Sequence, residues 1–214
     1  MPTVSAHSGQ CRKPKGWIGR IILRNMNSRH SRLTDWGLSF VAIGGQSAIL
    51  DVGCGGGRTI SKLAAKAPSA KVRGLDHSSA SVTVASKLNA AAMRAGRVEI
   101  REGSVSQLPY ATGTFDLVTA VETHFFWPDL ANDMCEIVRV LSPGGSFLLI
   151  AEIYAGASTT TSRLCEKYAP LTGMALLTPE GHRRLLETAG LQDVQVATDP
   201  KHGWICCAGK KPAP

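Results

Sequence analysis

Residues 48–57 read AILDVGCGGG, and this stretch decides how the rest of the chain folds. Its apolar half predicts a buried strand, and its glycines predict a tight turn that follows an acid, Asp51. Parallel α/β folds bind nucleotide-type cofactors at such strand ends. The dinucleotide fingerprint requires a third glycine where this chain has Arg58, so the spacing disfavours an NAD site and a dehydrogenase.

Helices and strands alternate after this turn. Apolar spacing predicts a helix over 60–67 that Pro68 ends, and a second strand over 71–76. The next helix is expected to bury one face made of Val84, Ala85, Leu88, Ala91 and Ala92. Further strands are predicted at 98–100, 115–121, 147–151, 191–197 and 204–208, with helices capped by Asp129 and Thr178 between them.

Two motifs carry a resemblance to a known family. DVGCGGG at 51–57 resembles motif I of the class I S-adenosylmethionine (SAM) methyltransferases, and LSPGG at 141–145 resembles their Leu-Lys-Pro-Gly-Gly turn. The resemblance covers roughly residues 45–210. It implies a three-layer, doubly wound α/β fold with a mostly parallel seven-stranded sheet, an antiparallel C-terminal strand hairpin and an N-terminal helical lid. It also implies SAM as the cofactor and S-adenosylhomocysteine as the product.

The glycine turn is expected to hold the amino-acid end of SAM. Free amides at the start of the helix after Gly57 suit a carboxylate, and Asp51 suits the cationic part of the cofactor. Asp76 ends the second strand at the spacing of a ribose-binding acid; the alternative is a helix cap that Ser78 or Ser79 shares.

The loop that begins at Gly103 is expected to contact the adenine. Many family members have an acid where this chain has Ser104, so backbone groups of Ser104 and Val105 are expected to read the ring edge instead. The predicted cofactor-binding set is Asp51, Gly53, Cys54, Gly55, Asp76, His77, Gly103, Ser104, Val105 and Val121.

Candidate catalytic residues follow the fourth predicted strand. Methyl transfer is an in-line displacement, so the protein must align the acceptor and, when the acceptor is protonated, remove a proton. Glu122 and His124 are the candidate general bases; cofactor binding by Glu122 and simple burial of His124 are the alternatives. These two residues lack a third ligand nearby in the sequence, so no metal site is predicted.

Two segments are expected to cover the acceptor. Residues 16–44 are too apolar for a free tail and form the predicted lid, and residues 154–178 form an insertion within the methyltransferase domain predicted at 45–210. Candidate acceptor contacts are His30, Trp36, Phe126, Trp127 and Tyr154, with Phe125 in the same aromatic wall. Packing of Trp36 and surface exposure of His30 are the alternatives. An acceptor enclosed in this way is a small molecule rather than a polymer.

The net charge of +8 is concentrated at the N-terminus, where seven basic residues and no acid precede Asp35. Residues 1–15 are predicted to be a disordered basic arm, and 211–214 a tail. An RNA methyltransferase that uses this arm is one alternative function, and a non-catalytic SAM-binding accessory protein is another. The Asn/Asp-Pro-Pro-Tyr/Phe signature of amino-methylating nucleic-acid enzymes is absent after the fourth strand, which makes nucleic acid a less favoured partner.

The remaining composition is ordinary for a single domain without a membrane span. The six cysteines lack metal-ligand spacing and are expected to be reduced, with Cys206 and Cys207 on opposite faces of one strand. Reduced thiols favour a cytoplasmic protein. A monomer or a homodimer is expected.

Overall fold

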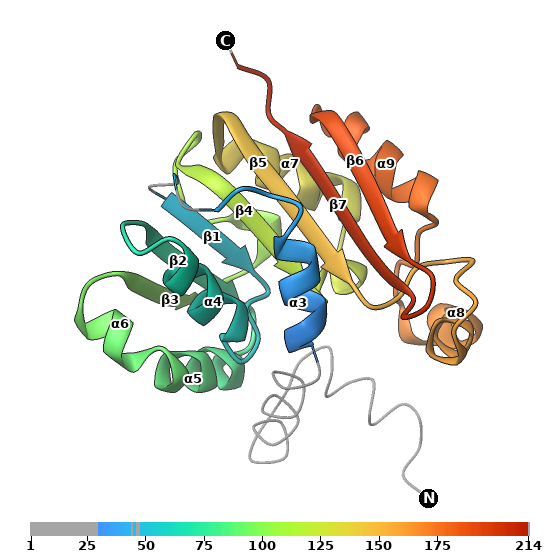
Figure 1. Cartoon of the computed structure of the whole chain (residues 1–214), viewed down its shortest axis with the longest axis horizontal. Coiled ribbons are helices and arrows are strands. Elements are labelled where there is room, and N and C mark those ends of the chain that lie inside the picture. The colour runs from blue at the N-terminus through green and yellow to red at the C-terminus, as the bar shows by residue number, and fades with distance from the viewer. Residues whose placement is uncertain (1–29, 44, 46–47, 214) are drawn as a thin grey trace, which may run out of the picture.

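The computed structural model describes residues 30–43, 45 and 48–213, and it places one seven-stranded sheet between two layers of helices (Figure 1). The predicted basic arm at 1–15 and the first part of the predicted lid, 16–29, lie outside the described residues. Within the described part of the chain, no helix is long and apolar enough to cross a membrane.

The sheet has the strand order β3-β2-β1-β4-β5-β7-β6. Strands β1 to β5 run parallel, whereas β7 is antiparallel to both β5 and β6. This arrangement confirms the predicted fold class. The strands are β1 (Ala48–Val52), β2 (Lys71–Asp76), β3 (Val98–Glu102), β4 (Phe115–Val121), β5 (Leu141–Ala151), β6 (Gln192–Asp199) and β7 (Trp204–Lys210).

Helices cover both faces of this sheet. One layer contains α3 (Ser31–Leu38), α4 (Arg58–Lys66), α5 (Ser79–Leu88) and α6 (Ala90–Arg94), and the other contains α7 (Leu130–Val140) and α9 (Pro179–Thr188). The insertion forms α8 (Thr160–Thr172), and two short 3-10 turns are η1 (Val105–Gln107) and η2 (His124–Phe126). Asp129 and Thr178 cap α7 and α9 as predicted.

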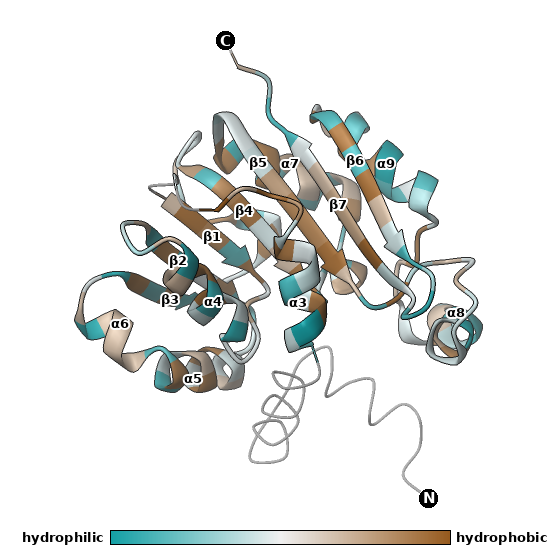
Figure 2. Cartoon of the chain, viewed as in Figure 1, coloured by the Kyte–Doolittle hydropathy of each residue, from teal (hydrophilic) through white to brown (hydrophobic). Residues whose placement is uncertain are grey.

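The core is divided in two by the sheet. Phe147 and Cys207 belong to the apolar cluster under α7 and α9, whereas Ile150 and Cys206 belong to the cluster under α3 and α4. The adjacent cysteines therefore lie on opposite faces, as the strand pleat requires. Figure 2 shows hydrophobic colour along β5 and hydrophilic colour over much of α9.

The prediction of one continuous apolar helix face over 84–92 is wrong. The chain ends α5 at Leu88, which is 45% exposed, and starts the separate short helix α6 at Ala90. The buried residues near the break are Ser81, Ala85 and Asn89. The Asn89 amide donates to the carbonyl oxygens of Gly57 (3.0 Å) and Ala85 (2.9 Å), so a polar side chain turns inward where the pattern suggested leucine.

Helix α3 lies flat on the sheet beside α4. A Cβ on Gly37 would stand 2.4 Å from Ile150 of β5, and Lys62 of α4 pairs with Asp35 at 2.6 Å. This part of the predicted lid is thus a member of the helix layer, and His30 at its start lies at the carboxyl edge of β4 and β5. Closure of the lid over the cofactor remains a prediction.

Candidate functional site

The glycine turn follows the carboxyl end of β1 and is hydrogen-bonded to the carboxyl end of β2. The amides of Gly53 and Cys54 both donate to the carbonyl of Leu75, at 2.8 and 3.0 Å. Gly53, Gly55 and Gly57 have φ values of 69°, 52° and 79°, a backbone region that suits glycine. The alternating glycines are therefore required by the path of the chain.

Two of these glycines also allow close approaches. A Cβ on Gly53 would lie 2.1 Å from Oγ1 of Thr123, which follows β4, and a Cβ on Gly57 would lie 2.8 Å from Ala85 of α5. The first contact brings the loop after β4 directly against the turn. The second lets α4 and α5 pack together, whereas the third glycine of the dinucleotide fingerprint serves helix–strand packing.

The N-terminus of α4 is open to an anion. Polar side chains cap the starts of α5, α7, α8 and α9, whereas the cap of α4 is Gly57, and no acid lies in its first turn. The first amides of a helix lack intrahelical partners and carry partial positive charge. This end of α4 therefore fits the carboxylate of SAM.

Asp76 braces the turn from the end of β2. The residue is 6% exposed, and its side chain accepts from the amides of Gly55 (2.8 Å) and Ser78 (2.9 Å). Ser78, and not Asp76, caps α5. A carboxylate offers about four acceptor positions, so two remain for ribose hydroxyls. His77 lies beside it, with Nδ1 3.8 Å from the carboxylate and a side chain that is 47% exposed.

Asp51 is buried beneath the turn. It is 1% exposed, and its carboxylate accepts from the hydroxyl of Thr119 on β4 at 2.6 Å. Burial is the main cause that raises the pKa of Asp51 to about 7, and the charge of Asp76 adds to the rise. Asp51 is thus a buried carboxyl beneath the turn rather than part of an open surface.

The loop after β3 closes the predicted adenine end. The Gly103 amide donates to the carbonyl of Asp76 at 3.0 Å, and the Ser104 hydroxyl accepts from the amide of Ser106 at 3.2 Å. Val105 is 7% exposed, while Ser104 is exposed. Val121 at the end of β4 is half-buried, and Cys54 is buried.

Glu122 stands where β4 ends, directly before Thr123. Its φ of 58° is rare for a residue with a side chain, and its amide donates to Ile150 of β5 at 2.9 Å. Its carboxylate accepts from the amide of Glu152. His30 lies beside both acids, with Nε2 3.9 Å from Glu122 and 3.5 Å from Glu152.

His124 is directed into the protein rather than toward the glycine turn. It is 1% exposed, and its Nε2 lies 3.0 Å from Nε2 of His182 on α9. Nδ1 of His182 faces the carbonyl of Thr178 at 2.9 Å; a carbonyl only accepts, so that nitrogen carries the proton and His124 donates to His182. Burial, followed by the neighbouring His182, holds the pKa of His124 well below its usual range. This geometry favours a packing role over that of a base.

The aromatic residues predicted to line the acceptor site are mostly packed. Trp127 and Tyr154 are each 8% exposed and belong to the core cluster under α7 and α9. Trp36 packs against Phe40 and Trp204, with ring centroids 5.1 and 5.7 Å away. Trp36 and Phe126, which lies in the loop after β4, are half-buried.

Three residues of this region were missed by sequence reasoning: Asn89, Thr123 and Glu152. Glu152 directly follows β5, so the rule that ligands lie beyond strand ends signals it. Asn89 and Thr123 contact the glycine turn from 32 and 70 residues away along the chain, and no pattern in the sequence marks them.

The insertion is fastened to the loop after β4. The Ala175 amide donates to Phe125 and the Ala155 amide to Leu177, both at 2.9 Å. Burial is the main cause that raises the pKa of the Cys165 thiol on α8, and the negative charges of Glu152 and Glu122 raise it further. Helix α8 therefore lies within electrostatic range of the two acids.

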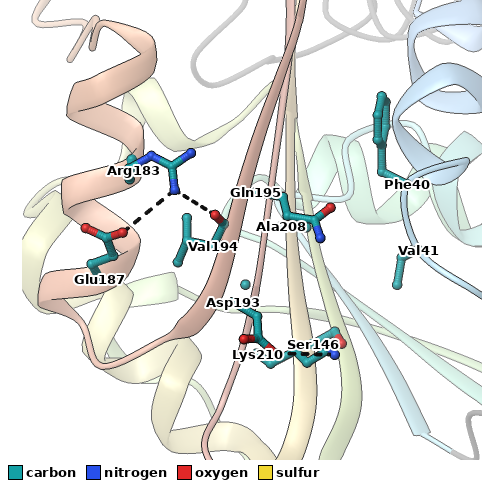
Figure 3. A pocket seen from close by; sticks show the side chains of 11 residues that line it. Phe40, Val41, Ser146, Arg183, Glu187, Asp193, Val194, Gln195, Ala208 and Lys210 are labelled. Atoms are coloured by element: carbon teal, nitrogen blue, oxygen red, sulfur yellow. Dashed lines mark hydrogen bonds and ion pairs between the residues drawn. The ribbon is translucent and has the colours of Figure 1, made fainter.

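A pocket of about 450 Å³ lies elsewhere, along β6 and β7 (Figure 3). Phe40, Ser146 and Lys210 line it on one side, and Arg183 and Glu187 of α9 on the other. Ser146 lies five residues before the carboxyl end of β5, so this pocket is separate from the glycine turn.

Comparisons with known proteins agree with the geometry. A family model described as a methyltransferase domain matches residues 50–149. An O-methyltransferase, cnsE of Penicillium expansum, is 31% identical over 148 residues, which are 69% of this chain and 53% of that protein. The chloroplastic tocopherol O-methyltransferase of Arabidopsis thaliana is 28% identical over 70% of this chain and 45% of its own length.

A solved structure has the same fold. The complex of the Haloferax volcanii Trm112 methyltransferase activator with a putative methyltransferase contains a chain that superposes with a TM-score of 0.74 at 20% identity, over 92% of this chain and 96% of that one. The present chain spans about half the length of the curated relatives that it matches.

Proposed function

Because the chain belongs to the class I SAM-dependent methyltransferases, we propose that it transfers the methyl group of SAM to a small-molecule acceptor. The observation that carries the proposal is the contact between Gly53 and Thr123, which places Glu122 directly beside the glycine turn. The donor and the acceptor would meet at this point, at the carboxyl ends of β1 and β4.

The residues of the turn fit SAM in three places. The open N-terminus of α4 would hold its carboxylate, the free acceptor positions of Asp76 would bind the ribose, and Ser104 with Val105 would border the adenine. Bound SAM supplies an electrophilic methyl group on a sulfonium. The work of the protein is to orient the acceptor and to exclude water from it.

Glu122 is the described carboxylate best placed to accept a proton from the acceptor. Its side chain is 9% exposed, and the amide of Glu152 fixes one of its oxygens. His124 lacks such access because its ring is directed at His182. We therefore assign the candidate role of base to Glu122 alone.

A small acceptor is favoured by the cover over this edge. Helix α8 lies within electrostatic range of Glu122 and Glu152, and Nε2 of His30 lies 3.9 and 3.5 Å from their carboxylates. The relative named for tocopherol acts on a small molecule by its name. A polymer would need a more open approach to the same atoms.

The test is methyl transfer from SAM labelled in its methyl group. The full chain is incubated with panels of phenols, carboxylic acids and amines, and in a separate arm with total RNA. Label in a small organic product supports the proposal, and label in RNA that falls steeply with added salt would replace it by an RNA methyltransferase. Bound SAM without transfer in any arm would indicate an accessory protein.

A variant separates the role of Glu122 from cofactor binding. Glu122→Gln should lower kcat by at least tenfold while the affinity for SAM stays within about twofold. An equal loss of both would mean that Glu122 serves the cofactor instead.

A further inference from the structure

We propose that His30, Glu122 and Glu152 form a binding site for a divalent cation at the acceptor side of the glycine turn. One possible ligand atom from each of these residues lies within 4.8 Å of the other two. They come from three elements far apart in the sequence: the start of α3, the end of β4 and the end of β5. The site itself does not depend on the proposed function, whereas the role given to the ion below does.

The distances match ligands that share one ion. Nε2 of His30 lies 3.5 Å from Oε1 of Glu152 and 3.9 Å from Oε2 of Glu122, well beyond a typical N–H···O hydrogen bond. Two ligands each about 2.1 Å from a metal are roughly 3.0 Å apart at a right angle and roughly 3.4 Å apart at the tetrahedral angle. Small side-chain adjustments would therefore bring all three atoms onto one ion.

The backbone holds each ligand in place. The carbonyl of His30 accepts from both the amide and the hydroxyl of Thr34, each at 2.8 Å, and Thr34 is buried. The Glu122 amide donates to Ile150, and its Oε1 accepts from the amide of Glu152, so Oε2 is the atom that faces His30. Such outer contacts orient metal ligands in known sites.

The three donor side chains are also largely shielded from solvent. The side chains of His30, Glu122 and Glu152 are 14%, 9% and 26% exposed, so two carboxylates are drawn together with little access to water. Their negative field reaches Cys165 on α8, where it raises the pKa of the thiol in addition to the effect of burial. Oxygen and imidazole donors together suit Mn²⁺, Fe²⁺ or Zn²⁺ better than soft metals.

An ion here would select the acceptor. It would bind a molecule that offers oxygen atoms, hold one of them beside the turn, and lower the pKa of a bound hydroxyl. With an ion bound, Glu122 would serve as its ligand in place of the base role proposed above, and the acceptor proton would leave to solvent. This part of the inference rests on the proposed function.

The experiment is calorimetric titration of the untagged full chain, stripped with a chelator, with Mn²⁺ and separately with Zn²⁺. We expect one ion per chain. Glu152→Gln and His30→Gln should each weaken binding by at least tenfold. The matched control is Glu166→Gln, which makes the same charge change on an exposed position of α8 and should leave binding within about twofold of the parent. A Glu152→Asp variant and circular dichroism melts of each variant show whether a loss of ion binding is caused by misfolding.

Titration with S-adenosylhomocysteine in the same samples separates the two proposals. If S-adenosylhomocysteine binds but neither ion binds up to millimolar concentration, the metal site is refuted and the methyltransferase proposal stands. Ion binding that Glu152→Gln and His30→Gln leave unchanged also refutes the site. If an ion binds as expected but S-adenosylhomocysteine does not, the metal site stands and the proposed function fails.

Discussion

The two sides of the site are built in opposite ways. The cofactor side is the glycine turn Gly53–Gly57 with Asp76 of β2, where the amides of Gly53 and Cys54 donate to Leu75 and the amide of Gly55 donates to the Asp76 carboxylate. The acceptor side combines His30, Glu122 and Glu152 with helix α8, which meet only because the sheet brings the ends of β4 and β5 together. A local motif thus identifies the donor, whereas the acceptor depends on the topology of the whole domain.

The largest effect is expected from Gly53→Ala, which tests whether the cofactor side is as rigid as its backbone suggests. The new Cβ would meet Thr123 at 2.1 Å, and φ of 69° is unfavourable for alanine. Affinity for S-adenosylhomocysteine, measured by calorimetry, should fall by at least about 100-fold because the turn must move (more than about 2.7 kcal/mol).

Gly96→Ala is the matched control for that variant. Gly96 has a φ of 70°, but nothing lies within 4 Å of the position that its new methyl group would take, so it carries the backbone strain of about 1–2 kcal/mol without the clash. Cofactor affinity should be unchanged in this control. Normal affinity in Gly53→Ala would show that the turn tolerates displacement and would remove the contrast between the two sides.

Asp76→Asn tests the assignment of the ribose site. The amide group would place a donor against the amides of Gly55 or Ser78 and remove the charge, so S-adenosylhomocysteine affinity should fall by about 5- to 150-fold, equivalent to about 1–3 kcal/mol. Asp193→Asn, at an exposed position of β6, should bind as the parent does. Equal affinities for the two variants would place the ribose elsewhere.

The His124–His182 pair tests the packing on the acceptor side. Burial lowers the pKa of both rings, so both stay neutral in the folded protein. The stability that they contribute is fully present above the unfolded-state pKa of about 6.5 and is lost as the pH falls toward their folded-state pKa. Between pH 7 and pH 5 the free energy of unfolding should drop by about 2 kcal/mol or less for each histidine.

Urea unfolding at several pH values measures this drop. The double variant His124→Leu/His182→Leu should lose most of the acid sensitivity because it lacks both titrating rings. The Thr178 carbonyl keeps its hydrogen bond from the amide of residue 182 in this variant. His77→Gln, which replaces a partly exposed ring, should keep the acid sensitivity. An unchanged pH profile in the double variant would contradict the packing role of the pair.

The smallest effect concerns Asp51 and links stability to the cofactor. With a pKa of about 7, Asp51 is largely protonated at pH 6 and largely ionised at pH 8, and the cationic donor favours the ionised form. SAM affinity should therefore rise with pH, by up to about tenfold over this range, and Asp51→Asn should flatten the dependence.

The same substitution has the opposite sign for folding. A carboxyl whose pKa is raised in the folded state binds protons more tightly there, so its ionisation lowers stability as the pH rises from 3.8 toward 7. Asp51→Asn should raise the thermal midpoint more at pH 8 than at pH 5. Identical shifts at both pH values would mean that Asp51 is ionised throughout.

The fold of the cofactor side was predictable because its signals are local. The glycine spacing directly follows the strand into Asp51, the acid at Asp76 ends the next strand, and apolar runs mark the buried strands. The same reasoning failed at Leu88, because a distant contact of Asn89 with Gly57 decided which residues turn inward.

The acceptor side was predicted only in part. Glu122 was identified from its place after β4 and His30 as a candidate acceptor contact, whereas Glu152 was not singled out and His124 faces His182 instead. The aromatic run after Glu122 suggested an acceptor wall, whereas Trp127 lies in the core. Aromatic residues satisfy either role, and only the packing of α7 and α9 distinguishes them.

A crystal structure of the full chain grown with S-adenosylhomocysteine tests the central claim most directly. We predict that the ribose hydroxyls contact the carboxylate of Asp76, that the amino-acid carboxylate lies at the start of α4, and that the sulfur faces the loop of Glu122. A ligand bound in the β6–β7 pocket, or a glycine turn with no ligand at saturating concentration, would contradict the account.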